Sequence, residues 1–326
     1  MNPHPFEKLT PDFIMDAIES KGYLCDGRNL ALNSYENRVY QIGIEDATPI
    51  IAKFYRPGRW SDQQILEEHD FSEELAEQEL PIVCAMKDAQ GQTLHHYQDF
   101  RFTLFERKGG HAPELDYRDN LLILGRLLGR MHLVGARKKF QHRPELNIQN
   151  FGYDSFEFIS EHFISPELKL AYDSLCRDIF KVMEQVIERA GAVNRIRVHG
   201  DCHVGNMLWR DDKPHFVDFD DARMAPAVQD IWMLLSGSRE QQGVQLNRIL
   251  DGYFEFNDFD MRELHLIEVF RTLRIMHYAA WLARRWSDPA FPHNFPWFNT
   301  ARYWEDHILE LREQFSALNE PPIRPL

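Results

Sequence analysis

The sequence has few cysteines and lacks long apolar runs. Its four cysteines, Cys25, Cys84, Cys176 and Cys202, are widely spaced and form no C-x-x-C pair, which argues against a disulfide framework and favours free thiols in a reducing compartment. The longest apolar runs fall well short of the roughly 20 residues that a membrane helix needs. Residues 1–7 show neither the basic nor the apolar region of a signal peptide. We therefore expect a cytoplasmic protein without a membrane anchor.

Positive charge is also in deficit, because 51 acidic residues face 37 basic ones and the formal net charge is −14. A field of that sign repels nucleic acid and anionic lipid, so we expect neither as a partner. The 15 histidines follow neither the H-E-x-x-H nor the H-x-E…C-x-x-C spacing of zinc sites, and most are expected at surface or capping positions. A hydrophobic content of 44% over 326 residues suits one large or two small packed domains, and we expect a monomer.

Strand patterns predict a small antiparallel sheet in the first third of the chain. Ser61 and Gln64 fit a capping box at the start of a helix that runs to Leu75. A shorter helix is expected near the N-terminus, where Pro11 is the start signal. The expected strands are residues 39–44, 49–55, 82–86 and 101–105, and the short helix is residues 11–21.

After a break at Gly109, Gly110 and Pro113, apolar residues recur at helical spacing. Gly125 and Gly129 lie four apart on one expected helix, which permits a neighbouring helix to approach closely. These patterns predict an α+β, two-lobed fold with an N-lobe of residues 1–106 built on the small sheet. The C-lobe, residues 107–326, is expected to be mostly helical. Its later helices are expected at residues 165–190, 227–235, 246–254, 261–286 and 300–318.

One stretch of polar residues has the spacing that phosphoryl transfer from ATP requires. H-G-D-C-H-V-G-N (199–206) contains Asp201 and Asn206, and V-D-F-D (217–220) follows with Asp218. In kinases one carboxylate accepts the proton of the attacking hydroxyl, and an Asn together with a second carboxylate holds Mg²⁺. We therefore expect Asp201 and Asp218 to act in catalysis and Asn206 and Asp218 to bind Mg²⁺, with Asp220 the next candidate ligand. The alternative is a turn whose polar residues only cap its neighbours.

Lys53 closes the strand I-I-A-K (50–53), a position typical of the kinase lysine that contacts the α- and β-phosphates of ATP. A glutamate on the following helix should orient it. Glu68 shares a helical stripe with Phe71 and Leu75, so it is favoured as this partner. Glu67 lies beside the stripe and remains the alternative.

A Gly-rich phosphate loop is missing, because S-Y-E-N-R (34–38) stands where G-x-G-x-x-G is usual. Backbone N–H groups of a tight turn can hold phosphates without glycine, and the side chains of Asn37 and Arg38 are alternatives. At the end of the last strand, F-E-R (105–107) occupies the connection where kinases bind adenine through the backbone. Glu106 is therefore assigned to the nucleotide pocket.

Other residues near the proposed site are expected to support it. Twelve positions separate Asp218 from Asp230, which leaves no room for a long activation loop. Asp230 is expected to brace the loop of Asp201. Cys202 is expected to have a raised thiol pKa beside Asp201 and to be a filler, not a nucleophile. The aromatic stretch 281–298 either rims the acceptor site or packs the last helices.

The H-G-D-x-H-x-x-N pattern is similar to the catalytic loop of aminoglycoside phosphotransferases and choline kinases. Over the whole chain, the sequence resembles the bacterial stress response kinase A family. The strings that carry this resemblance are N-S-Y-E-N-R-V-Y-Q (33–41), K-F-Y-R-P (53–57), R-W (59–60), Q-I-L-E-E-H (64–69), the catalytic loop, and A-W-L-A-R-R-W-S-D-P-A-F-P (280–292).

The resemblance implies a cytoplasmic Ser/Thr protein kinase with an aminoglycoside phosphotransferase-like fold, which uses ATP and Mg²⁺ and acts in the stress response. It also implies that the N-lobe binds the nucleotide and that the C-lobe carries the catalytic loop and the acceptor site. By the same match, Asp201 is the catalytic base, Asn206 and Asp218 are metal ligands, and Glu36 is a further residue near the nucleotide. The implied acceptor is a Ser or Thr of a protein, with the chain itself as one candidate. The same loop also serves small-molecule kinases, so an amino alcohol, choline, homoserine or an aminoglycoside remains an alternative acceptor. A nucleotide-binding module without catalysis is the third hypothesis.

Overall fold

The helices and strands belong to two compact units, each built from separate segments of the chain. The computed structural model describes residues 5–117, 119–211 and 213–326, so the start of the segment 1–7, where no signal peptide is expected, lies outside the described residues. The first unit contains the described residues up to Glu114, together with Phe140–Arg143 and His203–Ala222. The remainder forms the second unit. The division into lobes of residues 1–106 and 107–326 stays a prediction.

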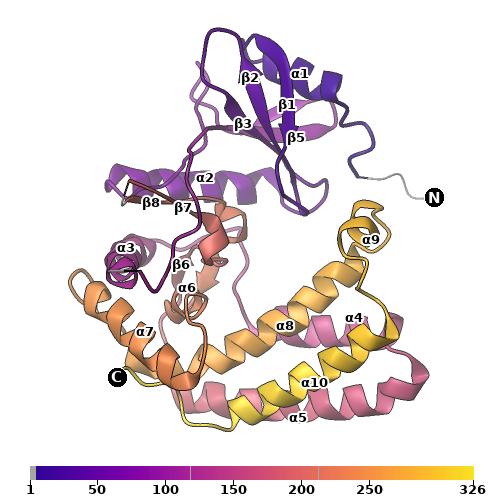
Figure 1. The fold of residues 1–326 in the computed structure, drawn as a ribbon, viewed down its shortest axis with the longest axis vertical. Coiled ribbons are helices and arrows are strands. Elements are labelled where there is room, and N and C mark those ends of the chain that lie inside the picture. Colours follow the sequence, from indigo (N-terminus) through magenta and orange to yellow (C-terminus); the bar gives the residue numbers. More distant parts are fainter. Residues whose placement is uncertain (1–4, 118, 212) are drawn as a thin grey trace. The chain divides into compact units, whose positions relative to one another are not determined.

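The first unit contains a five-stranded antiparallel sheet with the order β1-β2-β3-β5-β4 (Figure 1). A two-stranded hairpin, β7-β8, belongs to the same unit. Its elements are α1 (Pro11–Glu19), β1 (Cys25–Ala31), β2 (Arg38–Ile44), β3 (Ile50–Phe54), α2 (Asp62–Glu77), β4 (His95–Tyr97), β5 (Phe100–Glu106), the 3-10 turn η2 (Val204–Asn206), β7 (Met207–Arg210), β8 (Lys213–Phe216) and the 3-10 turn η3 (Phe219–Asp221).

The two faces of strand β3 have different surroundings: one packs in the hydrophobic core and the other lines a pocket. Ile50, Ala52 and Phe54 lie in the hydrophobic core with α1. Ile51 and Lys53 line the pocket, because successive side chains of a strand point to opposite faces of the sheet. This alternation is what brings a lysine to the pocket while the strand remains anchored.

The strands at residues 39–44, 49–55 and 101–105 are confirmed as β2, β3 and β5, with small differences at their ends. Strand β1 is not predicted by the sequence pattern, because polar residues interrupt its alternation; it pairs with β2 through an irregularity between Cys25 and Asn29. Residues 82–86 make isolated bridges in place of a regular strand: Ile82 pairs with Phe216 and Ala85 with Phe105.

The second unit is mostly helical (Figure 1), which confirms the α+β class. No helix within the described ranges combines the length and the apolar character that crossing a membrane would need. The elements of the second unit are α3 (Asn120–Gly135), the π-helical turn η1 (Gln149–Tyr153), α4 (Asp154–His162), α5 (Pro166–Ala190), β6 (Ile196–Val198), β9 (Arg223–Ala225), α6 (Val228–Trp232), α7 (Arg239–Tyr253), the 3-10 turn η4 (Met261–Leu266), α8 (Ile267–Arg284), α9 (Ala290–Asn294) and α10 (Ala301–Leu318).

Helices α3 and α7 approach each other through glycines. A Cβ atom added to Gly125 would lie 2.0 Å from the carbonyl oxygen of Ile249. A Cβ atom added to Gly252 would lie 2.2 Å from the carbonyl oxygen of Leu122. Both distances are far below van der Waals contact, so only glycine fits at this crossing. The close approach predicted from Gly125 is confirmed.

Candidate active site

Lys53 is buried on β3 and is paired with two carboxylates. Its Nζ donates a hydrogen bond to Asp218 Oδ1 at 2.9 Å and lies 3.2 Å from Asp220 Oδ1. Burial alone lowers the pKa of an amine. The carboxylates of Asp218, Asp220 and Glu68 outweigh this effect and hold the pKa of Lys53 well above its usual value. Lys53 is therefore a fixed cation in a defined position.

Asp218 lies in a turn with an uncommon backbone conformation. Its φ of 60° and ψ of 65° fall in the left-handed region, which costs a non-glycine residue roughly 1–2 kcal/mol. The next residue, Phe219, is buried and packs edge-on against Phe71 of α2, with ring centroids 6.0 Å apart. This anchor holds the turn, while the Asp218 side chain remains 51% exposed and lines the pocket.

Asp220, unlike Asp218, is buried within an ion-pair network. Arg59 Nη1 lies 2.7 Å from Asp220 Oδ2, and Arg59 Nη2 lies 3.0 Å from Asp221 Oδ1. Burial acts to raise the pKa of the Asp220 carboxyl, but the charges of Arg59 and Lys53 hold this pKa below its usual value. Asp220 is thus a permanent anion with a cation on each side, which stabilises the turn that carries Asp218.

Arg143 connects the same turn to helix α2. Its Nε donates to the carbonyl of Ala222 at 2.5 Å, and its Nη2 donates to the carbonyl of Asp220. Its Nη1 donates to the carbonyl of Gln64 on α2 at 2.8 Å. A single buried guanidinium therefore satisfies backbone acceptors from two separate segments, using the fork of donors that only arginine has.

Sequence reasoning did not assign a role to Arg59 or Arg143. Charged residues outside periodic segments are expected at the surface, so no pattern in the sequence marks them as buried. For Arg59, the neighbouring Trp60 is the one sequence feature that could have indicated a buried guanidinium packed on an aromatic ring. Its ring lies 5.0 Å from the Arg59 guanidinium and 4.6 Å from that of Arg143, and a tryptophan beside an arginine is a common cation–π pair.

The two candidate partners of Lys53 on α2 have different surroundings. Glu68 is buried, and its Oε2 lies 3.9 Å from Arg143 Nη1. Burial raises the pKa of Glu68 above its usual value, against the opposing charges of Lys53 and Arg143. Glu67 instead accepts hydrogen bonds from the backbone N–H groups of residues 141–143. Glu68 thus shares the environment of Lys53, and its orienting role stays a prediction.

A pocket of about 380 Å³ lies in the first unit beside these charged groups. One part of its wall is apolar and includes Val39, Ile51 and Phe105. Another part is polar and includes Lys53, Glu68, Asn206 and Asp218. Apolar walls beside a fixed cation suit a ligand with a flat ring and an anionic tail. The remaining lining residues are Leu32, Asn33, Ser34, Ser72, Val83, Glu106, Lys108, Gly205, Leu208, Val217 and Phe219.

Of the other residues predicted to bind the nucleotide, Glu106 lines the pocket, whereas Glu36 and Asn37 contact neighbouring arginines. Glu106, at the end of β5, lines the pocket. Glu36 Oε1 lies 3.2 Å from Arg56 Nε, and its Oε2 lies 3.6 Å from Arg59 Nη1. Asn37 Oδ1 accepts a hydrogen bond from the Arg56 N–H at 3.1 Å. Neither Glu36 nor Asn37 is among the described residues that line the pocket.

The segment 34–38, which replaces a Gly-rich loop, is held by its own side chains. Ser34 Oγ donates to the carbonyl of Asn37 at 3.3 Å. Arg38 Nη1 donates to the carbonyls of Tyr35 and Asn37, each at 3.1 Å. Ser34 also lines the pocket. The Arg38 guanidinium therefore supports the turn, and Ser34 brings this segment to the wall of the pocket.

Asn206 and Asp218 provide oxygen atoms suited to Mg²⁺. The backbone joins their segments, because the Val217 N–H donates to the carbonyl of Asn206 at 3.0 Å. Mg²⁺ prefers oxygen ligands and usually binds through one or two carboxylates together with water and substrate phosphates. Nowhere in the described ranges do three or more His, Cys, Asp or Glu side chains gather to hold a metal by themselves. The donor set fits a metal that arrives with phosphate ligands.

Asp201 belongs to the second unit, on the loop that follows β6. Asp230 braces this loop, since its Oδ2 accepts the N–H of His199 and its Oδ1 that of Gly200, both at 2.9 Å. Gly200 has a φ of 85°, which favours glycine. The predicted bracing role of Asp230 is confirmed. The Asp201 carboxylate lies 2.5 Å from Arg274 Nη1 of α8.

Cys202, next to Asp201, is fully buried. Burial raises the pKa of its thiol well above the usual value, and the charges of Asp230 and Asp201 add to this effect. A thiol that stays protonated is a poor nucleophile, so Cys202 fills space as predicted.

Most of the aromatic stretch 281–298 packs the last helices. Phe291, Phe295 and Phe298 are buried, and Phe298 contacts Trp304 of α10 with ring centroids 5.4 Å apart. Trp297 remains 45% exposed. Any contact with an acceptor is therefore limited to a few of these rings.

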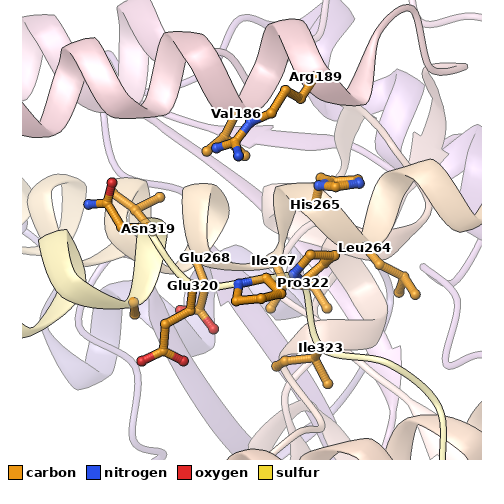
Figure 2. A pocket seen from close by; sticks show the side chains of 13 residues that line it. Val186, Arg189, Leu264, His265, Ile267, Glu268, Asn319, Glu320, Pro322 and Ile323 are labelled. Atoms are coloured by element: carbon orange, nitrogen blue, oxygen red, sulfur yellow. The ribbon is translucent and has the colours of Figure 1, made fainter.

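A second pocket of about 310 Å³ lies where the C-terminal segment meets α5 and α8. Figure 2 shows Arg189 on one side of it and Glu268 and Glu320 on the other. Both acidic groups already have partners: Arg239 Nε lies 2.9 Å from Glu320 Oε2, and Arg271 Nη1 lies 3.0 Å from Glu268 Oε1. The described residues of this lining include none of the predicted site residues, so the first pocket remains the candidate site.

Known proteins match this chain over nearly all of its length. The phosphotransferase enzyme family matches residues 29–267. Stress response kinase A of Escherichia coli O157:H7 is 43% identical over 325 residues, which cover 98% of this chain and 96% of that protein. Serine/threonine protein kinase RdoA of Salmonella typhimurium is 41% identical over 324 residues, which cover 99% and 98% of the two chains.

Solved structures with the same fold include kinases of small molecules. The amicoumacin kinase hAmiN, in complex with AMP-PNP, Ca²⁺ and Ami, has a TM-score of 0.71 and 21% identity, with 95% of both chains covered. A microcompartment-associated aminopropanol kinase has a TM-score of 0.70 and 15% identity, with 95% of this chain and 96% of the other covered. At these identities the likeness concerns the fold alone.

Proposed function

Because this chain belongs to the phosphotransferase enzyme family and to the stress response kinase A family, we propose that it is an ATP- and Mg²⁺-dependent kinase that phosphorylates a Ser or Thr hydroxyl of a protein. The name of the Escherichia coli relative, stress response kinase A, supports a role in the bacterial stress response. The proposed setting is the cytoplasm, which the four free cysteines support.

One observation carries the proposal: a buried lysine and two oxygen donors line one pocket whose other wall is apolar. Val39, Ile51 and Phe105 would enclose the adenine ring, and Lys53 would neutralise the α- and β-phosphates. In the structure Lys53 is paired with Asp218 and Asp220, so its charge is held in place before a phosphate arrives. A pre-positioned cation stabilises developing charge without having to reorganise.

Asn206 and Asp218 would hold Mg²⁺, which would neutralise the charge of the phosphates. Asp218 is suited to this role because its side chain is the more exposed of the two aspartates, at 51% against 5% for Asp220. Asp220 is already surrounded by Arg59 and Lys53. We therefore assign metal binding to Asp218 and support of the turn to Asp220.

Asp201 would accept the proton of the acceptor hydroxyl. As the hydroxyl oxygen forms a bond to the γ-phosphorus, the bond between that phosphorus and the β,γ-bridging oxygen breaks. ADP takes the leaving electron pair, and the hydroxyl proton passes to the Asp201 carboxylate. Asp230 keeps the loop of Asp201 in place through the hydrogen bonds of His199 and Gly200.

A small-molecule kinase is the second candidate function. The observation that favours it is the fold, because the solved neighbours at TM-scores of 0.71 and 0.70 are named as amicoumacin and aminopropanol kinases. Its acceptor would be an amino alcohol, choline, homoserine or an aminoglycoside. A protein kinase is the preferred function because a relative at 41% identity is named as a serine/threonine protein kinase.

The test is transfer of label from γ-labelled ATP with Mg²⁺ to a generic protein acceptor, to the enzyme itself and to a panel of small alcohols. Label on Ser or Thr of protein is expected. Transfer should be slow, because only twelve positions separate Asp218 from Asp230 and leave no activation loop to hold a peptide. Background labelling of protein together with rapid phosphorylation of a small alcohol would establish the second candidate instead.

A further inference from the structure

Helix α8 presents a stripe of basic and aromatic side chains that starts at Asp201. Arg274, Tyr278 and Trp281 follow one another at spacings of four and three residues, so they lie on the same side of the helix. Arg285, directly after the end of the helix, continues the series four residues further on. Arg274 contacts Asp201 directly, with Nη1 2.5 Å from Oδ1. The proposed catalytic base therefore lies at one end of this stripe.

The charge of α8 is unusual for this chain, whose net charge is −14. Between Glu268 and Asp288 the sequence has four arginines and no acidic residue. Two of these arginines have other partners: Arg271 Nη1 lies 3.0 Å from Glu268 Oε1 of the same helix, and Arg284 Nη2 donates to the carbonyl of Asp154 at 2.9 Å. Arg274 is the arginine of the stripe that contacts Asp201.

Arg274 has the geometry to bind a second anion. Its side chain is 44% exposed, and within the described ranges its hydrogen bonding is limited to Nη1, which donates to Asp201. A guanidinium carries five N–H donors in a planar fork, so Nε and Nη2 can donate to another carboxylate while Nη1 stays with Asp201. Arginine is well suited to such bidentate binding.

The aromatic part of the stripe offers a surface for backbone and aliphatic groups. Tyr278 is 42% exposed and stacks on Trp281, with ring centroids 5.7 Å apart and planes 17° apart. Phe291 packs its edge against Trp281 at 5.0 Å, and the Arg285 guanidinium lies 5.3 Å from the Trp281 ring. The two rings are thus fixed by their neighbours, which lowers the entropy lost when a peptide binds them.

We propose that this stripe is the acceptor-binding surface, and that it takes a Ser- or Thr-containing peptide segment with acidic residues beside the hydroxyl. The inference rests on the proposed function and specifies its substrate class. Arg274 would bind the acidic side chain that flanks the acceptor, and Tyr278 and Trp281 would pack against the peptide. A cationic amino alcohol or aminoglycoside would instead bring its ammonium group close to the Arg274 guanidinium beside Asp201. Two positive charges close together repel each other.

The experiment compares three acceptors with the full chain, ATP and Mg²⁺: a Ser peptide flanked by Glu, the same peptide flanked by Lys, and 1-amino-2-propanol. The acidic peptide should have the highest kcat/KM, about tenfold above the basic one, as expected for one charge-assisted hydrogen-bonded pair. Arg274→Gln should remove this preference by raising the KM of the acidic peptide. Arg274→Lys, which retains the charge, should retain part of the preference.

Arg302→Gln is the matched control, because Arg302 is an exposed arginine of α10 in the same unit and pairs with Asp306 at 3.6 Å. It should leave the ratio of the two peptides unchanged. The ratio also separates recognition from any general effect of Arg274 on Asp201, since a change in Asp201 would slow both peptides equally.

A preference for the basic peptide would overturn the inference and leave protein-kinase activity established. An unchanged ratio in Arg274→Gln would do the same. Failure of the proposed function has a different result: neither peptide nor the enzyme itself receives label in a reaction that depends on Asp201, whether or not 1-amino-2-propanol is phosphorylated.

Discussion

Arg59 Nη1 lies 2.7 Å from Asp220 Oδ2, and both side chains are largely buried, with 15% and 5% of their surfaces exposed. The same guanidinium lies 3.6 Å from Glu36 Oε2. Arg59 therefore links the turn that carries Asp218 with the segment that replaces a Gly-rich loop. Glu36 is thus connected to that turn through Arg59, although it is not among the described residues that line the pocket.

Replacing Arg59 with Ala should destabilise the first unit strongly. The change would leave Asp220, Asp221 and Glu36 without their shared cation, and removing one partner of a buried pair typically costs about 3–5 kcal/mol. Chemical denaturation of the wild type and of Arg59→Ala measures the loss. Arg28→Ala is the matched control, since Arg28 is 72% exposed where it pairs with Asp26 and should lose at most about 1 kcal/mol. Equal losses in the two variants would show that the network adds nothing to stability.

Asp218→Ala should weaken Mg²⁺-dependent binding of ATP, because the metal would lose its carboxylate ligand. Calorimetric titration with a non-hydrolysable ATP analogue, with and without Mg²⁺, measures the effect. The gain in affinity from Mg²⁺ should fall in Asp218→Ala and persist in Asp211→Ala, a control aspartate whose side chain is 87% exposed. An unchanged metal dependence in Asp218→Ala would transfer the ligand role to Asp220.

Asp201→Asn should abolish phosphoryl transfer and retain the affinity for nucleotide. Asn has nearly the same shape but cannot accept a proton, and loss of a general base typically lowers the rate by about 10²- to 10⁴-fold. Single-turnover transfer and nucleotide binding are measured on the same preparation. Asp306→Asn, an exposed aspartate of α10, should behave as the wild type. Wild-type turnover in Asp201→Asn would remove Asp201 from the mechanism.

Local patterns in the sequence predict the parts of this protein that depend on local chemistry. The capping box at Ser61 and Gln64 is present at the start of α2, because both hydrogen bonds form within four residues. The alternation of β3 brings Lys53 to the pocket for a similar reason. Gly125 marks a helix crossing, since only its lack of a side chain admits the carbonyl of Ile249.

Buried arginines lie beyond the reach of such patterns. Arg143 binds the carbonyls of Gln64 and Ala222, which are 79 positions away on either side of it. Nothing near Arg143 in the sequence indicates that these carbonyls will face it. The same holds for Asp220, whose charge is offset by Arg59 and Lys53 from distant segments. The position of Lys53 at the pocket was therefore predictable from a local pattern, whereas the network around Asp220 depends on tertiary structure.

His307 should make stability depend on pH in mildly acidic solution. It lies on α10 with 3% of its surface exposed, and burial lowers its pKa from 6.5 to about 4. As the pH falls below 6.5, the unfolded chain takes up a proton at this histidine while the folded chain does not until about pH 4. The unfolded state then binds more protons, so this contribution to stability rises with pH between about 4 and 6.5. His307→Phe keeps an aromatic ring beside Tyr303 and Trp304 and removes the titration. Denaturation of both proteins at pH 5 and pH 8 measures the difference, with the pH 8 values accounting for any change in packing. The wild type should lose more stability than His307→Phe between pH 8 and pH 5, and equal losses would mean that His307 is protonated as readily in the folded chain as in the unfolded one.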